Sequence, residues 1–235
     1  MRIQHPIAAA VLTTALLAAS PQPAGAAANS LIASWWMNET PGARTMIDNS
    51  GHGFRGSIGK EIGTGVRVNG ATAYRFARLE PDTPPPHPGH LITVPDDSAL
   101  DPGTRDYAVT FRFRTTGKFG NIIQKGQATV AGGNYKVQIP SGIVQCYYRG
   151  SAGAILVSAP RKLNDGAWHT ASCERTRKGV YLYADGKLVA GRSGPTGKVA
   201  NTWPVTIGGK ISCDQIEVGC DYYNGDLDWV DISAS

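Results

Sequence analysis

The sequence predicts an all-β fold, and two observations support this expectation. Residues 108–116 alternate strictly between apolar and polar side chains, which is the two-residue period of a half-buried strand. An Asp185-Gly186 pair separates two short apolar runs at residues 180–183 and 187–189, a pattern typical of a β-hairpin. Since no segment shows a convincing helical repeat, the periodicity favours an antiparallel sandwich or barrel.

Further candidate strands follow in order along the chain, and most are separated by clusters of Gly, Pro, Asn or Asp. They comprise residues 31–37, 122–125, 135–139, 143–148, 155–158, 168–175, 204–207 and 226–232. The chain has 235 residues with 17% charged residues, which is enough for one β domain with a substantial core. We therefore expect a single domain over residues 30–235.

Residues 1–26 have the features of a secretory signal peptide. Arg2 precedes an apolar run over residues 7–19, and a small-residue site ends at Ala26. The run is shorter than the roughly 20 residues of a membrane-spanning helix. We expect cleavage near Ala26 to Ala28 and a secreted, extracellular protein with no membrane span.

Export changes how the four cysteines are interpreted. Cys146, Cys173, Cys213 and Cys220 form an even set, so two disulfides are expected in an oxidising compartment, with three connectivities possible. The short interval from Cys213 to Cys220 could close on itself, which would leave Cys146 with Cys173.

Charge is distributed unevenly along the sequence. Residues 104–198 contain 15 Lys+Arg and 4 Asp+Glu, whereas residues 27–103 and 199–235 together contain 7 Lys+Arg and 14 Asp+Glu. A basic middle suits an anionic polymer, and acidic ends suit a hard cation. The alternative for both regions is a mixed, solvated surface.

Four short fragments suggest a family when they are taken in order between Leu31 and Ile232. They are residues 36–39 with 45–53, 107–116 with 122–126, 164–169 with 180–186, and 205–209 with 222–231. Together they resemble a laminin G-like domain of the concanavalin A-like lectin/glucanase superfamily, particularly its secreted actinobacterial members. The resemblance implies a jelly-roll sandwich of two curved antiparallel sheets. It also implies one cystine on neighbouring strands and one before the last strand.

Two core features are expected within this fold. Cys146 and Cys173 each lie in a predicted strand, so a bridge between them should stabilise the fold by roughly 3 kcal/mol. Trp168 begins a strand directly after a turn, which suits a large core side chain. A stacking platform for sugar is the alternative for this tryptophan.

The family resemblance also implies a structural calcium ion. Carried over, Asp48 and Asp228 supply carboxylates, and turn carbonyls near Gly53 complete the shell. Oxygen ligands of this kind are what calcium prefers. Asp226 lies two residues before Asp228 and should point to the same face. The alternative is that these acids are simply exposed at turn and strand ends.

The superfamily includes glycosidases and lyases, so catalytic groups have to be considered. A retaining glycosidase needs two closely spaced carboxyl groups, but the chain has no alternating E-x-D-x-E run. It also lacks the G-x-S-x-G, H-E-x-x-H and P-loop motifs. We therefore expect no catalytic residues and no enzyme activity.

A secreted binding module, most plausibly for carbohydrate, is the leading hypothesis. The candidate ligand residues are Arg112, Arg114, Tyr147 and Arg149, with Lys136, Tyr148, Trp203, Tyr222 and Tyr223 as further candidates. The arginines suit anionic glycans and the aromatic rings suit neutral ones. A protein-interaction or envelope-associated module without sugar binding is the alternative, and a polysaccharide-degrading enzyme is a third possibility. No specific nucleic-acid motif is present.

Overall fold

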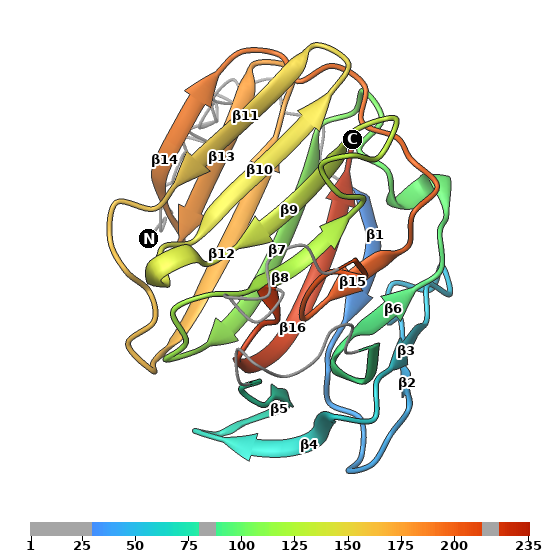
Figure 1. The fold of residues 1–235 in the computed structure, drawn as a ribbon, viewed down its shortest axis with the longest axis vertical. Helices are drawn as coiled ribbons and strands as arrows, with labels where there is room; N and C mark the ends of the chain where they lie inside the picture. The colour runs from blue at the N-terminus through green and yellow to red at the C-terminus, as the bar shows by residue number, and fades with distance from the viewer. Residues whose placement is uncertain (1–29, 80–87, 213–220) are drawn as a thin grey trace, which may run out of the picture.

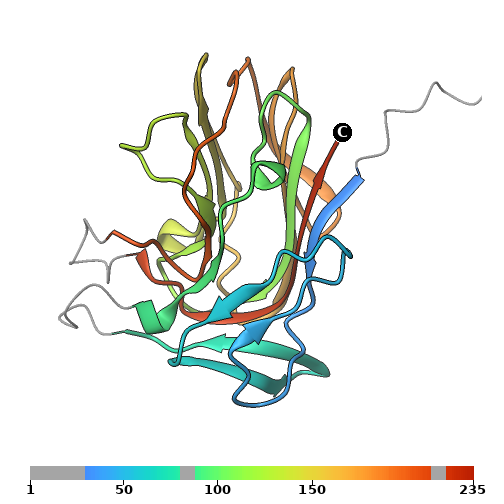
Figure 2. The ribbon, with the colours of Figure 1, turned by 90° about the vertical axis from the view of Figure 1, so that its right-hand side faces the viewer.

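Two antiparallel sheets of eight strands each pack face to face in the computed structural model, which describes residues 30–79, 88–212 and 221–235. Figure 1 looks at the face of the sandwich, and Figure 2 shows its two layers from the side. Every pair of named strands is antiparallel, as the register of each pair shows. The predicted all-β jelly-roll sandwich is confirmed. The proposed signal peptide and the Cys213–Cys220 pair lie outside the described residues.

The first sheet, which we call sheet A, is built around the long strand β16. Its strands are, in spatial order, β14 (Lys187–Ser193), β13 (Gly179–Ala184), β12 (Trp168–Arg175), β7 (Tyr107–Arg114), β16 (Gly225–Ala234), β5 (Ala71–Phe76) and β4 (Ile62–Val68). Strand β1 (Ser30–Trp35) pairs with the second half of β16, on the side where β5 pairs with its first half.

In the second sheet, sheet B, four strands that follow one another in the chain form a simple meander along one edge. In spatial order it contains β11 (Gly153–Ser158), β10 (Gln145–Gly150), β9 (Asn134–Gln138), β8 (Asn121–Lys125), β15 (Val205–Ile207), β6 (Ile92–Val94), β3 (Gly56–Ile58) and β2 (Thr45–Met46). Three short 3-10 turns connect strands, at Pro88–His90, Ser98–Leu100 and Pro140–Gly142. Among the described residues, no helix is long and apolar enough to cross a membrane.

Alternation along the strands places the core between the two sheets. Val109, Phe111 and Phe113 of β7 are fully buried, while Arg112 and Arg114 lie on the outer face of sheet A. In β10, Tyr148 is buried in the core and Tyr147 points outward. The period-two pattern therefore predicted both the strands and their inward faces.

A disulfide between Cys146 and Cys173 joins the two layers. Cys146 lies in β10 of sheet B and Cys173 lies in β12 of sheet A, with their Cα atoms 5.5 Å apart. The pairing agrees with the sequence hypothesis. The expected placement on neighbouring strands is wrong, because the bond crosses the core from one sheet to the other.

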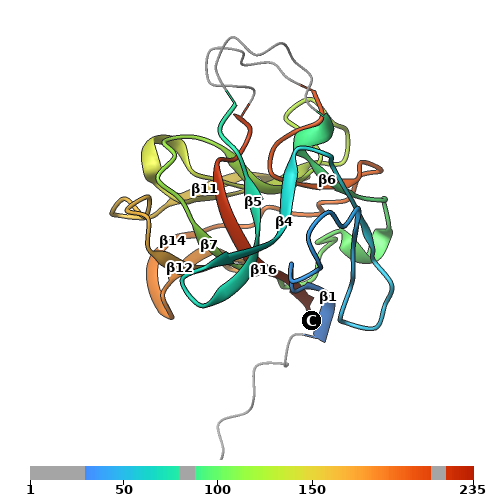
Figure 3. The same ribbon diagram turned by 90° about the horizontal axis from the view of Figure 1, so that it is seen from below.

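The hairpin of β4 and β5 was missed by sequence reasoning. Figure 3, viewed from below, shows these strands crossing the lower end of the sandwich. Their turn is formed by Asn69 and Gly70, both with positive φ (47° and 83°). An Asn-Gly pair is the strongest short signal for such a turn, so the sequence did contain the clue.

Candidate functional site

The arginines that were predicted to bind ligand on sheet A are paired with acidic side chains. Arg112 donates to the carboxylate of Asp228 and lies over the ring of Trp168, with 4.8 Å from its guanidinium carbon to the ring centroid. Trp168 is half-buried on the outer face, so its expected core position is wrong. An alternating strand with an inward His169 must turn Trp168 outward.

Asp226 is shared by two arginines on the same face. It accepts from Arg75 Nε at 2.8 Å and from Arg114 Nη1 at 2.9 Å, and its side chain is almost fully buried. Arg114 also donates to the carbonyl of Gly166 at 2.6 Å. Such charge-assisted bonds fix the side chains in place. Arg112 and Arg114 therefore already have protein partners where a ligand would otherwise bind.

The carboxylate of Asp48 holds together the turn that follows it. Its two oxygens accept from the backbone N–H groups of Ser34, Ser50 and Phe54 and from the hydroxyl of Ser50, at 2.8–3.0 Å. Burial alone would raise the pKa of Asp48, but these hydrogen bonds together lower it below the ordinary value. Gly53, at φ 85°, has its carbonyl oxygen 2.9 Å from the N–H of Arg55.

These residues, as arranged, do not fit a calcium ion. Four donors already occupy the lone pairs of Asp48, and Asp228 is paired with Arg112. The contact that links Asp48 to the last strand runs instead through Ser34, whose hydroxyl donates to Asp231 at 2.7 Å. Among the described residues, no three His, Cys, Asp or Glu side chains gather closely enough to hold a metal. The calcium hypothesis is therefore untested, and this arrangement leads us to expect no effect of chelation.

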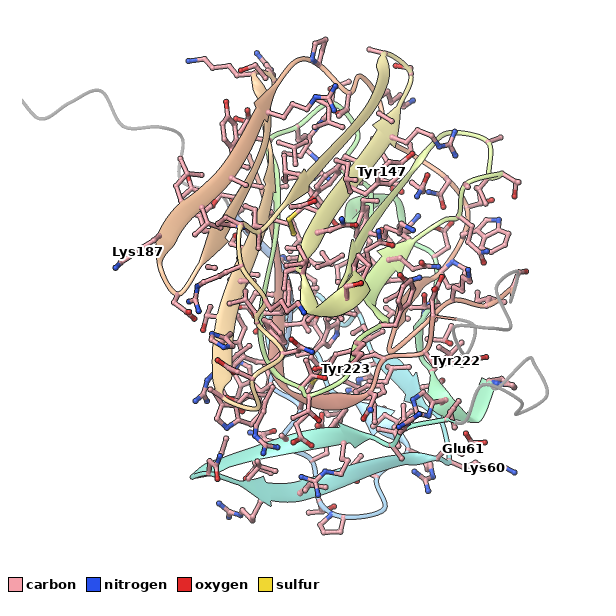
Figure 4. All side chains as sticks on the ribbon, turned by 60° about the vertical axis from the view of Figure 1, so that its left-hand side comes forward. Lys60, Glu61, Tyr147, Lys187, Tyr222 and Tyr223 are labelled. Atoms are coloured by element: carbon pink, nitrogen blue, oxygen red, sulfur yellow. A yellow bond between two sulfur atoms is a disulfide. The ribbon has the colours of Figure 1, made fainter. Side chains whose placement is uncertain are left out.

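The outer face of sheet B presents a different set of side chains. The strand register places Leu156 beside Tyr147, Tyr147 beside Lys136, and Lys136 beside Gln124. All four follow one row across strands β11, β10, β9 and β8. Tyr147 is labelled in Figure 4 on this face, and its ring lies 5.9 Å from Lys136 Nζ.

A groove of about 260 Å³ is hollowed into this face. Its lining consists mostly of amides, with two lysines, one tyrosine and two aliphatic side chains. It comprises Asn121, Gln124, Gln127, Ala128, Asn134, Lys136, Gln138, Tyr147, Leu156 and Lys210. None of these described residues carries a carboxylate, so this lining offers no acid or nucleophile pair for glycoside hydrolysis. We refer to it below as the amide groove.

Three buried amides form the floor of the amide groove. Asn121, Gln124 and Asn134 are only 1%, 3% and 2% exposed. Asn121 Nδ2 donates to Gln124 Oε1 at 3.0 Å, whereas Asn121 Oδ1 has no hydrogen-bond partner among the described residues. An unsatisfied buried acceptor costs free energy unless something pairs with it. This oxygen is itself buried beneath the groove and is not open to a ligand there.

Arg149, which was predicted as a ligand residue, instead fixes the rim of the amide groove. Its guanidinium donates to Asn134 Oδ1 at 2.9 Å and to the carbonyls of Gln127 and Val130 at 3.2 and 2.9 Å. Gly133 allows this close approach, because a Cβ there would lie 2.1 Å from the Arg149 carbonyl oxygen. The loop after β8 is thereby bound to β10.

A buried lysine supports the same rim from below. Lys125 Nζ lies 2.7 Å from both Asp96 and Asp101 and 2.6 Å from the carbonyl of Asn201. The Asn201 side chain in turn donates to the carbonyl of Gly133 at 3.0 Å. Because every group of the network has a charged or hydrogen-bonded partner, the network fixes the position of the loop around Gly133.

The structure brings together only part of the predicted ligand set. Tyr147, Lys136 and Arg149 lie in or beside the amide groove, whereas Arg112 and Arg114 lie on the opposite sheet. Tyr148, Tyr222 and Tyr223 are buried and present no face to a ligand. The floor amides were missed, although the isolated amides in the apolar run of β8 were a signal, because buried amides require partners.

Comparisons with known proteins agree with this architecture. Residues 89–235 match the family model of the Concanavalin A-like lectin/glucanases superfamily. No curated protein matches the chain.

Among solved structures, domain 4 of AbnA, a GH43 extracellular arabinanase from Geobacillus stearothermophilus in complex with arabinotriose, has a TM-score of 0.61 at 13% identity. The match covers 88% of this chain and 93% of that one.

Two toxin binding domains share the fold as well. The binding domain of Paraclostridial Mosquitocidal Protein 1 matches with a TM-score of 0.59 and 12% identity over 87% of this chain and 48% of that one. The binding domain of botulinum neurotoxin serotype D matches with a TM-score of 0.55 and 14% identity, over 87% and 47%. The chain spans about half the length of these two domains, and at such identities the likeness shows the fold alone.

Proposed function

Because the chain belongs to the concanavalin A-like lectin/glucanase superfamily, we propose that it is a secreted, non-catalytic module that binds carbohydrate in the amide groove. The observation that supports this most directly is the groove itself, whose lining combines several amide side chains with the ring of Tyr147. Sugar hydroxyls both donate to and accept from amide groups. The amide-rich lining offers further donors and acceptors, and Tyr147 offers a ring face to sugar C–H groups.

The groove favours a neutral glycan over an anionic one. The amide groups of the lining can hydrogen-bond sugar hydroxyls without any charge on the ligand. Lys210, which also lines the groove, already has Asp221 2.6 Å from its Nζ. Of the predicted arginines, Arg112 and Arg114 lie on the other sheet and are paired with acidic side chains. Arg149 lies beside the groove, but its guanidinium is bound to Asn134 and to two carbonyls of the rim.

A relative with the same fold supports the choice of ligand class. The arabinanase domain, which this chain matches over most of both lengths, is described in complex with the neutral sugar arabinotriose. The candidate signal peptide places the module where extracellular polysaccharides occur.

A glycan array, followed by pull-down on insoluble polysaccharides at low and high salt, tests the proposal. We expect salt-insensitive binding to neutral glycans, because no long-range charge attraction is needed. Binding only to acidic glycans and only at low salt would contradict the neutral ligand class. No binding to any glycan would favour a protein-interaction module, and new reducing ends or unsaturated products would reveal an enzyme.

A matched pair of tyrosines links the binding to the groove. Tyr147→Ala should weaken glycan binding by about tenfold, since it removes the ring face. Tyr183→Ala removes a half-buried tyrosine from the outer face of β13 on the opposite sheet and should leave binding unchanged. Equal effects of the two variants would place the ligand elsewhere.

A further inference from the structure

A second groove lies on the outer face of sheet A, where β16 changes its neighbour. The register pairs β5 with β16 from Gly225 to Leu227, and β1 with β16 from Val230 onward. Asp228 and Trp229 fall in the interval between the two pairings, where the β16 register also shifts against β7. A groove of about 500 Å³ opens there, lined by Trp36, Asn38, Thr72, Asp228, Trp229 and Asp231. We refer to it as the tryptophan groove.

Two indole rings form the apolar part of this groove. Trp36 is 54% exposed, whereas its neighbour Trp35 is fully buried and donates to the carbonyl of Phe54 at 2.6 Å. Trp229 is half-buried on β16. An exposed tryptophan beside a second one in a concave site is typical of a surface that covers a ligand, because a solvated indole face has apolar area still to bury.

The polar part of the groove is acidic. Asp228 and Asp231 line it, and none of the described lining residues is Lys, Arg or His. Asp228 is paired with Arg112, whereas the Asp231 carboxylate accepts a hydrogen bond from the neutral Ser34 hydroxyl. Burial raises the pKa of Asp231, so its charge is poorly solvated. Although the chain has a formal net charge of +5, this acidic site should favour a cationic ligand.

Aromatic faces next to an uncompensated carboxylate are the combination that recognises an ammonium group on an apolar frame. We propose that the tryptophan groove is a second carbohydrate site, specific for sugars that carry a protonated amine, such as glucosamine units. The sugar ring lies against Trp36 and Trp229, and its ammonium group pairs with Asp231. This site is independent of the amide groove, which is on the other sheet and has a different chemistry.

Calorimetric titration of the purified chain with glucosamine pentamer and with its fully N-acetylated counterpart tests this proposal. Acetylation removes the positive charge and keeps the ring, so we expect binding of the pentamer and at least about tenfold weaker binding of the acetylated form. Equal binding of the two oligomers would overturn the proposal, and so would no binding of the pentamer.

Variants separate this site from the amide groove. Trp36→Ala and Asp231→Asn should each weaken pentamer binding by about tenfold, while Tyr147→Ala should leave it unchanged. Melting curves of each variant establish that the fold is retained. If Tyr147→Ala abolishes pentamer binding and Trp36→Ala does not, the second site does not exist. Neutral-glycan binding to the amide groove is measured separately and can fail without affecting this result.

Competition distinguishes an amino sugar from other cations. An excess of putrescine or of calcium should not displace the pentamer, because neither can cover the two indole faces. Displacement by putrescine at equal concentration would show a general amine site and overturn the sugar assignment. Displacement by calcium would show a metal site at Asp228 and Asp231 instead.

Discussion

The outer faces of the two sheets use polar side chains in opposite ways. On sheet A, Arg75, Arg112 and Arg114 are paired with Asp226 and Asp228. On sheet B, amides line a groove and one buried amide oxygen has no partner in the described part of the chain. The arginines that look reactive in the sequence are thus already paired, whereas the amides of sheet B line a groove that is open to a ligand.

The uneven charge of the sequence is explained by the same pairing. The basic middle of the chain supplies Arg112 and Arg114 on β7, and the acidic end supplies Asp226 and Asp228 on β16, which is hydrogen-bonded to β7. Neighbouring strands therefore bring opposite charges together. A charge count along the sequence overestimates the surface charge that a ligand meets.

The largest effect on stability should come from removing the disulfide that joins the two sheets. The double variant Cys146→Ala/Cys173→Ala removes the bond between β10 and β12, and we expect unfolding to become easier by about 3 kcal/mol. Urea titration with and without the bond measures this loss. A difference below about 1 kcal/mol would mean that the core alone holds the sheets together.

The next largest effect on stability should come from the outer face of sheet A, where the arginines are paired with acidic side chains. Asp226→Asn leaves Arg75 and Arg114 without their shared carboxylate, so we expect a loss of about 2 kcal/mol, less than for a fully buried pair because both arginines are partly exposed. Asp228→Asn is the matched control, with a loss below about 1 kcal/mol, because its partnership with Arg112 is more exposed. A reversed order in urea titrations would contradict the structural role given to Asp226.

A smaller, pH-dependent effect of opposite sign is expected at Asp231. The pKa of Asp231 is raised in the folded protein because burial disfavours the charged form. The protonated side chain therefore stabilises the fold below the ordinary pKa of 3.8. That stabilisation is lost as the pH rises through the pKa of the folded protein. Asp231→Asn should therefore raise the melting temperature at neutral pH and leave it unchanged in strong acid. A lower melting temperature at neutral pH would refute this sign.

Substitutions in the amide groove should change stability little and glycan binding strongly. Asn121→Leu/Gln124→Met replaces both members of a buried hydrogen bond by apolar groups of similar size, which is often nearly neutral for folding. Neutral-glycan binding should be weakened, because two of the amides that line the groove are replaced by apolar side chains. A well-folded double variant that still binds glycan with unchanged affinity would exclude this groove as the site.

The smallest effect should follow chelation. Since the lone pairs of Asp48 are occupied by protein donors and Asp228 is paired with Arg112, EGTA should leave the melting curve unchanged. A lower melting temperature in EGTA that calcium restores, with calcium found by elemental analysis, would revive the ion inferred from the family resemblance.

Much of the fold could be predicted because alternation is a local property. Strand β12 matches its predicted residues 168–175, and the two faces of β7 follow directly from the order of its side chains. Strands β4 and β5 were missed, because the glycines of β4 weaken the pattern and the Asn69-Gly70 turn was overlooked. The site could be predicted less well, because it depends on which strands become neighbours. Tyr147 pointed to it, but Asn121 and Asn134 come to line the same groove as Tyr147 only after β8, β9 and β10 have paired.

The way Arg149 binds the rim of the amide groove has a consequence for how a ligand would associate. Its hydrogen bonds to Gln127, Val130 and Asn134, and the contact of Asn201 with Gly133, fix the loop before any ligand arrives. Association then loses little conformational entropy, so the groove is preorganised and its affinity is set by the contacts themselves. The free and bound backbones should superpose closely, and a more mobile rim, as in Arg149→Ala, should weaken binding without removing any atom that touches the sugar.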